Sequence, residues 1–343
     1  MSTRNSMPFH ASLADWEARV QTHLPQIPRS YVRVIAWGSF AMVMAQSCGL
    51  TSMSVVLAAL CGQSPNTLRQ RLREFAYAAA AKRGTFRTAL DVTTLFPALV
   101  RWIVAWWQPD DRRMVLVMDA TTLRQTVTVL TISIVYRGCA IPVAWQCVGA
   151  TVPGAWRPHW ERLITTIQPA IPASWTVLVA ADRGLYGHWL FQAIVRAGWH
   201  PLLRINARGF HRPAADAPWH PLAAVVRHPG DRWMGQTTCF KGQSVPCTRL
   251  AAWDAAYADP WLVITDLAPD AATWAWYGMR SWIEQGFKDL KRGGWHWEQT
   301  KMTDPERIAR WWVLLAVATL WVVSVGGEAD RTDAANATGE DEP

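Results

Sequence analysis

The chain has 343 residues and a formal net charge of +8, and half of its residues are hydrophobic. This length and apolar content can build a substantial core, which excludes a disordered protein. Residues 328–343 hold six acids and one arginine, so the rest of the chain carries an excess of thirteen positive charges. Such an excess favours a polyanionic partner, nucleic acid first and an anionic membrane second, with general solubility as the alternative.

The cysteines and the apolar stretches indicate a cytosolic protein. Six cysteines show no C-x-x-C pair and no zinc-ligand spacing, which predicts reduced core residues. The first residues are polar, so no signal peptide is expected. Residues 34–67 are interrupted by Gly, Ser, Gln and Pro, and residues 311–325 are shorter than the roughly 20 residues of a spanning helix. We therefore expect buried helices and no membrane partner.

Residues 1–108 are predicted to form an all-α domain. Within it, residues 54–61 and 66–75 have the pattern of two helices joined by a short turn. The second helix carries Arg69, Arg71 and Arg73. Two interpretations remain open, a helix-turn-helix that binds DNA ends or two bundle helices with a solvated arginine face.

The pattern changes to alternating strands and helices after Pro109. Short, continuous apolar runs at 114–118 and 177–181 are typical of buried strands. The other predicted elements are strands at 126–136, 141–148 and 201–205, a turn at 137–138, and helices at 159–167 and 185–199. The order β-β-β-α-β-α-β predicts an α/β fold with a mixed sheet and covering helices.

The last part of the chain is predicted in three pieces. Residues 208–270 are rich in Pro, Gly, Trp and short β segments such as 261–265, which indicates a β-rich insertion. It separates a first core segment, 112–207, from a second, 271–327. In the second segment we expect helix from Trp274 to Val325 with one break at Gly293-Gly294. The acidic residues 328–343 are predicted to be a disordered tail.

Two aspartates follow predicted strands. Asp119 comes directly after the run 114–118, and Asp182 comes directly after 177–181. Open α/β sheets commonly place their sites at the carboxyl ends of strands, so both are candidate site residues. Each alone is more typical of a turn or a helix cap than of a site.

A helical stripe supplies a third carboxylate. Tyr277, Arg280, Glu284 and Lys291 lie at offsets 0, 3, 7 and 14, and Lys288 joins them, so on one helix they face one way. Surface ion pairs of about 0.3–0.5 kcal/mol each are the alternative explanation. The two upstream aspartates favour a site in which three carboxylates hold two hard cations and the other groups bind a phosphodiester.

These motifs resemble a known family. The spacing Tyr277-x2-Arg280-x3-Glu284-x6-Lys291 is similar to the Y-R-E-K signature of bacterial insertion-sequence transposases, the insertion-sequence-four-like group. Asp182-Arg183-Gly184-x-Tyr186 resembles the family's second-aspartate motif, and Asp119 stands where the first aspartate belongs. The resemblance extends over residues 112–325.

The resemblance implies an RNase H-like catalytic core with an all-β insertion. It implies a DDE transposase, an endonuclease that cleaves DNA at insertion-sequence ends and joins it to a target, by cut-and-paste through a hairpin. Asp119, Asp182 and Glu284 would ligate two Mg²⁺ ions, with Mn²⁺ as a substitute. The first and fourth strands are neighbours in that fold, so the two aspartates would meet.

The resemblance also suggests further residues and partners. Tyr277, Arg280 and Lys291 would bind DNA phosphates, with Lys288 and Arg183 as weaker candidates. An aromatic residue of the insertion would stack on a flipped base; Trp253, Trp233 and Trp261 are candidates, with a core role as the alternative.

The expected partner is double-stranded DNA, both transposon ends and target, bound by a homodimer in the bacterial cytoplasm at the nucleoid. Two other functions remain open. One is a catalytically inactive DNA-binding protein derived from a transposase, and the other is an RNase H-like nuclease that cleaves without joining.

Overall fold

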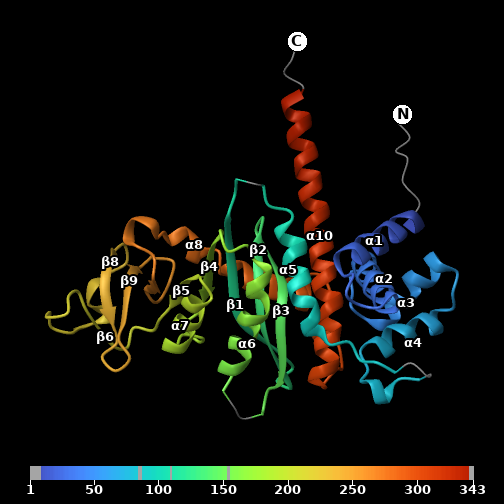
Figure 1. Ribbon diagram of the computed structural model, residues 1–343, viewed down its shortest axis with the longest axis horizontal. Coiled ribbons are helices and arrows are strands. Elements are labelled where there is room, and N and C mark those ends of the chain that lie inside the picture. The colour runs from blue at the N-terminus through green and yellow to red at the C-terminus, as the bar shows by residue number, and fades with distance from the viewer. Residues whose placement is uncertain (1–8, 84–86, 109, 153–154, 340–343) are drawn as a thin grey trace.

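The computed structural model of the protein describes residues 9–83, 87–108, 110–152 and 155–339. The chain begins with a helical bundle, and another helix leads into the sheet (Figure 1). These helices are α1 (Phe9–His23), α2 (Arg29–Ala45), α3 (Leu50–Cys61), α4 (Pro65–Phe75) and α5 (Phe96–Val104). The predicted helix, turn and helix are present as α3 and α4. Ser64 caps α4 by accepting a hydrogen bond from the Thr67 amide at 3.2 Å.

The centre of the molecule is a mixed sheet covered by helices, as predicted. Its first strands are β1 (Arg113–Leu123), β2 (Val127–Tyr136), β3 (Cys139–Gly149), β4 (Thr176–Ala181) and β5 (His200–Arg204). They lie in the order β3-β2-β1-β4-β5; β2 is antiparallel to its neighbours β1 and β3, and β4 is parallel to its neighbours β1 and β5. Helices α6 (Arg157–Ile167) and α7 (His188–Arg196) connect β3, β4 and β5. This is the RNase H-like arrangement that the resemblance implied.

The β-rich residues after β5 extend the same sheet. Their strands are β6 (Phe210–Arg212), β7 (His220–Pro221), β8 (Arg232–Cys239), β9 (Val245–Ala252) and β10 (Trp261–Thr265). Strand β10 pairs directly with β5, and the sheet continues through β9, β8, β6 and β7. Residues 261–265 were predicted to belong to the insertion, and the structure places them beside the last core strand.

The end of the chain differs from the helix with one break that was expected there. Its elements are α8 (Trp274–Gly278), α9 (Ser281–Lys288), a π-helical turn (Asp289–Gly293), a short 3-10 helix (Trp297–Gln299) and α10 (Pro305–Gly339). The first interruption is therefore at Met279-Arg280, ahead of the expected Gly293-Gly294. Helix α10 continues to Gly339, where a disordered tail was predicted, and residues 340–343 lie outside the described residues.

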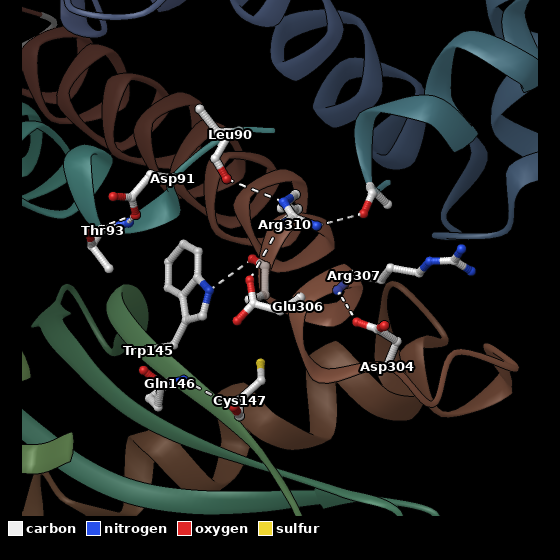
Figure 2. Close-up of polar contacts among 12 residues, drawn as sticks. Leu90, Asp91, Thr93, Trp145, Gln146, Cys147, Asp304, Glu306, Arg307 and Arg310 are labelled. Atoms are coloured by element: carbon white, nitrogen blue, oxygen red, sulfur yellow. Dashed lines mark hydrogen bonds and ion pairs between the residues drawn. The ribbon is translucent and has the colours of Figure 1, made fainter. Parts of the chain in front are cut away.

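Helix α10 joins the sheet to the helical bundle (Figure 1). The Trp145 indole on β3 donates to the carbonyl of Ala309 at 2.9 Å, and Arg310 donates to the carbonyls of Leu90 and Ala76 (Figure 2). The segment Pro305–Gly326 is long and apolar enough to span a membrane, but 72% of its most apolar window is buried inside the protein. Packing between the two halves of the fold accounts for its composition.

Candidate active site

Asp119 and Asp182 leave the parallel ladder at the same level. The last parallel pair joins Met118 of β1 to Ala181 of β4, so the two aspartates are the next residue on each strand. Asp119 was expected to end its strand, and this was wrong. Strand β1 runs on to Leu123 because it keeps pairing with β2 after β4 has ended. The expectation that the two carboxylates meet at one edge is supported by this register.

A residue not anticipated from the sequence lies beside Asp182. Arg204 ends β5, and its Nη1 lies 3.6 Å from Asp182 Oδ1. The register explains the contact, because Ala181 pairs with Leu203 and the next residues are Asp182 and Arg204. Arg204 ends a short apolar strand in the sequence, but its partner is set by the pairing of β4 with β5, which one strand does not reveal.

Helix α9 brings Glu284 to the two aspartates. It packs on β1, β2 and β3 through Ile283, which is buried among apolar side chains of the sheet. The close approach depends on Gly286, because a Cβ there would lie 3.3 Å from the Ala140 carbonyl oxygen. The sequence therefore places an apolar residue and a glycine on the inner face of α9 and the glutamate at its exposed side.

Arg280 links the carboxylates. Its Nη1 lies 3.7 Å from Asp119 Oδ2, and its Nη2 donates a short hydrogen bond to Glu284 Oε1. The Arg280 side chain is 12% exposed and that of Glu284 is 50% exposed, so the arginine is the inner member of the pair. The Arg280 guanidinium thus offsets the negative charges of Asp119 on β1 and Glu284 on α9.

The electrostatics of Asp119 show that the three carboxylates interact. Burial raises the pKa of Asp119, and the nearby charges of Asp182 and Glu284 raise it further. The hydrogen bond from the Ala120 amide, at 2.7 Å, and the charge of Arg280 act in the opposite direction. Burial lowers the pKa of Arg280, but Tyr277, Asp182 and Glu284 raise it by more, so the net shift is upward.

Tyr277 completes the cluster. Its ring packs edge-on against Trp261 of β10 at 5.3 Å between centroids, and its hydroxyl is buried without a hydrogen-bond partner in the described part of the chain. Burial raises its pKa and so does Asp182, while Arg280, by its charge and by a hydrogen-bonding contribution, and Arg204 lower it. The phenol therefore lies protonated among the charged groups, next to the Arg280 guanidinium.

The remaining cations predicted for phosphate binding form no ion pair with the three carboxylates among the contacts of the described residues. Lys288 is exposed at the end of α9, and Arg183 pairs with Asp259 at 3.2 Å. Lys291 was expected on the stripe of Glu284, but the π-helical turn changes the helical phase between them. The charges acting on Lys291 are those of Glu298 and Arg292.

The three candidate tryptophans are all engaged with other groups. Arg249 lies over the Trp233 ring at 4.6 Å, Trp253 donates to the Tyr257 carbonyl at 3.0 Å, and Trp261 packs on Tyr277. Tyr257 was not anticipated from the sequence; its ring is half exposed and lies 5.0 Å from that of Trp261. Its position in a loop next to β10 carried no motif that could have identified it.

Comparison with known proteins identifies the family. Residues 140–321, more than half of the chain, match the family described as the transposase DDE domain. The chain belongs to this family. The match includes Asp182 and Glu284 and begins after Asp119, which the sheet register places level with Asp182.

Solved structures with a similar fold include a piggyBac transposase synaptic complex with hairpin DNA. That protein is 10% identical to this chain, with a TM-score of 0.43, and the similarity covers 94% of this chain and 73% of that chain. No curated protein matches the sequence.

The residues at this edge fit a divalent metal by their chemistry. All the candidate ligands are carboxylate oxygens, which Mg²⁺ and Mn²⁺ prefer. Asp182 Oδ1 is buried and accepts no hydrogen bond from the described residues, and its partner there is the charge of Arg204 at 3.6 Å. No group of three His, Cys, Asp or Glu side chains is arranged for a metal within the described ranges, and the Arg280 guanidinium lies between two of these carboxylates.

Removing the charge of Asp119 is expected to stabilise the metal-free protein. Its folded-state pKa is raised above the unfolded value, so ionisation costs stability as pH rises through the folded pKa, and the cost is absent below the unfolded pKa. Asp119→Asn should raise the thermal midpoint at pH 7, and the gain should vanish at pH 3. A midpoint that falls at pH 7 would contradict this electrostatic account. Asp266→Asn, which removes the carboxylate paired with His200, is the control and should lower the midpoint.

Proposed function

We propose that this protein is a metal-dependent DDE transposase that cleaves DNA at insertion-sequence ends and joins it to a target. The observation that carries the proposal is the meeting of Asp119, Asp182 and Glu284 from three separate elements, with Arg280 between them. Three converging carboxylates are costly to hold together unless cations offset their charge; Arg280 and Arg204 do so in part, and bound metal ions would add to them.

The carboxylates would hold two Mg²⁺ ions, with Mn²⁺ as a substitute. When bound, such ions generate an attacking hydroxyl and stabilise the leaving 3′ oxygen. The chain itself places Asp119 and Asp182 on neighbouring strands. It places Glu284 on helix α9, which packs closely on the sheet because Gly286 has no side chain. Rigid placement of this kind supplies much of the rate advantage in phosphoryl transfer.

The neighbouring cations and phenol would bind the phosphates at the cut. Arg280 would exchange its carboxylate partners for a phosphate, and the unpaired hydroxyl of Tyr277 would donate to another phosphate oxygen. The clustering of Tyr277, Arg280 and Glu284 supports membership of the Y-R-E-K group for three of the four signature residues. Lys291 would contact the duplex farther from the cut, since it lies beside Glu298.

The helical bundle would bind the DNA ends. A groove of about 450 Å³ lies between α2 and α4, and its lining includes Tyr31, Arg71, Lys82 and Arg83. Lys82 Nζ lies 3.1 Å from the Tyr31 hydroxyl, and Arg71 is 5.4 Å from the centre of the Trp37 ring. Cations held against aromatic rings at the edge of a groove suit a phosphate backbone. We propose that α4 contacts the adjacent DNA groove.

The products of a reaction with DNA carrying the element's own ends and Mg²⁺ test this function. A transposase should give cleaved ends or hairpins, followed by products in which the 3′ ends are joined to target DNA. Cleavage without joined products would favour the RNase H-like nuclease, and end binding without cleavage would favour an inactive derivative. Joining two ends needs two active sites, so we propose a homodimer on DNA, acting in the bacterial cytoplasm at the nucleoid.

A further inference from the structure

A second group of cations lies away from the carboxylates, around Glu298. Arg292 Nε lies 3.2 Å from Glu298 Oε2, and Arg124 Nε donates to the Glu298 backbone carbonyl at 3.0 Å. Lys291 precedes Arg292 on the same π-helical turn; burial lowers its pKa, while the charge of Glu298 raises it and that of Arg292 lowers it. Residues 174 positions apart in the sequence are thus joined at one place.

The position of this group is fixed by two unusual backbone features. Arg124 and Gln125 have φ angles of 46° and 58°, which make a tight turn between β1 and β2. Lys291 and Arg292 lie on the π-helical turn that follows α9. The turn between β1 and β2 and the π-helical turn after α9 therefore meet at Glu298.

The group lies on a path from the active site to the helical bundle. Arg124 is five residues beyond Asp119 and directly follows the end of β1, about 17 Å away along the strand direction, which corresponds to roughly five base-pair steps of DNA. On the other side, the Cys48 amide at the α2–α3 junction donates to the Trp295 carbonyl at 2.7 Å. The segment that carries Glu298 therefore also touches the bundle.

The charge and exposure of the group suit a polyanion. Arg292 pairs with the Glu298 carboxylate and Arg124 binds the Glu298 backbone carbonyl, so the cations of this group outnumber that carboxylate, and the side chain of Arg292 is 81% exposed. Surface ion pairs contribute little to stability, so folding alone gives little reason to gather these charges. Asp289, the nearest acid on the π-helical turn, accepts a hydrogen bond from Gln285 at 2.8 Å.

We propose that Arg124, Lys291 and Arg292 form a phosphate-binding ridge for double-stranded DNA between the carboxylates and the helical bundle. The inference rests on the proposed function and adds to it the surface that holds the duplex beside the cut. Glu298 is its positioning residue, since its carboxylate and its carbonyl orient the two arginines. Contacts of this kind fix the position of the duplex and do not read its sequence.

Binding to a fluorescent duplex without divalent metal tests the ridge. Each phosphate contact contributes about 0.9 to the slope of log K against log salt. Arg124→Gln/Arg292→Gln should therefore lower the slope by about 1.8 and weaken binding to two unrelated sequences equally. Arg113→Gln removes an exposed arginine at the opposite end of β1 and should leave the slope unchanged.

The outcomes separate this inference from the proposed function. If the wild type binds and cleaves DNA but the double variant has the same slope as Arg113→Gln, the ridge is refuted and the transposase function stands. If the wild type binds no DNA, both are refuted. A loss of slope with an unchanged thermal midpoint supports the ridge, since it excludes misfolding.

Discussion

Replacing Arg280 with glutamine is expected to destabilise the metal-free protein by about 2 kcal/mol and to lower the rate of DNA cleavage by about 100-fold. The stability effect arises because Asp119 and Glu284 lose the cation between them. It is smaller than for a fully buried pair, since the Glu284 side chain is half exposed. The rate effect arises because a phosphate would lose its guanidinium donor.

Magnesium distinguishes this explanation from simple misfolding. Without the competing guanidinium the carboxylates should attract Mg²⁺ more strongly, so Mg²⁺ should raise the thermal midpoint of the variant more than that of the wild type. Arg183→Gln is the control, because its ion pair with Asp259 is more than half exposed and should be worth at most about 1 kcal/mol. An equal Mg²⁺ response in wild type and Arg280→Gln would contradict a shared site.

Replacing Arg310 with methionine should cost about 3–5 kcal/mol of unfolding free energy. Arg310 is buried, and it donates to the carbonyls of Leu90 and Ala76 and to Glu306 (Figure 2). Methionine fills similar space but leaves two carbonyl oxygens without their donor. Because these carbonyls belong to the segment between the bundle and the sheet, the loss should loosen the bundle from α10.

Thermal or denaturant unfolding checks this expectation. The neighbouring Arg307→Met is the matched control, because Arg307 lies over the Tyr77 ring at 4.4 Å and should contribute only about 0.5–1 kcal/mol. If the two variants lose the same stability, the Arg310 network does not join the two halves of the fold. Proteolysis of the bundle ahead of the sheet in Arg310→Met would support the predicted loosening.

The sequence predicted those parts of the fold that depend on local patterns. The apolar runs at 114–118 and 177–181 became β1 and β4, and the positions of Asp119 and Asp182 after them made a meeting at one edge foreseeable. The turn at 137–138 is also present, with φ angles of 47° and 78° at Arg137 and Gly138. Periodicity and turn residues are sufficient for features of this kind.

The parts that were missed depend on pairing between distant segments. Strand β1 passes Asp119 because β2 continues beside it, and Arg204 reaches Asp182 through the register of β4 with β5. Neither effect is visible in one strand alone. Likewise, a helical projection assumes a constant angle per residue, and the π-helical turn at Asp289–Gly293 broke that assumption for Lys291.

The most direct test of the central claim compares wild type with Glu284→Gln on DNA carrying the element's own ends, with Mg²⁺. Glu161→Gln, which removes a carboxylate of an exposed ion pair on α6, is the control. We expect wild type and Glu161→Gln to cleave the ends, and Glu284→Gln to bind the same DNA while its cleavage falls by at least about a thousandfold. Cleavage by Glu284→Gln at the wild-type rate would contradict the assignment of this edge of the sheet as the active site.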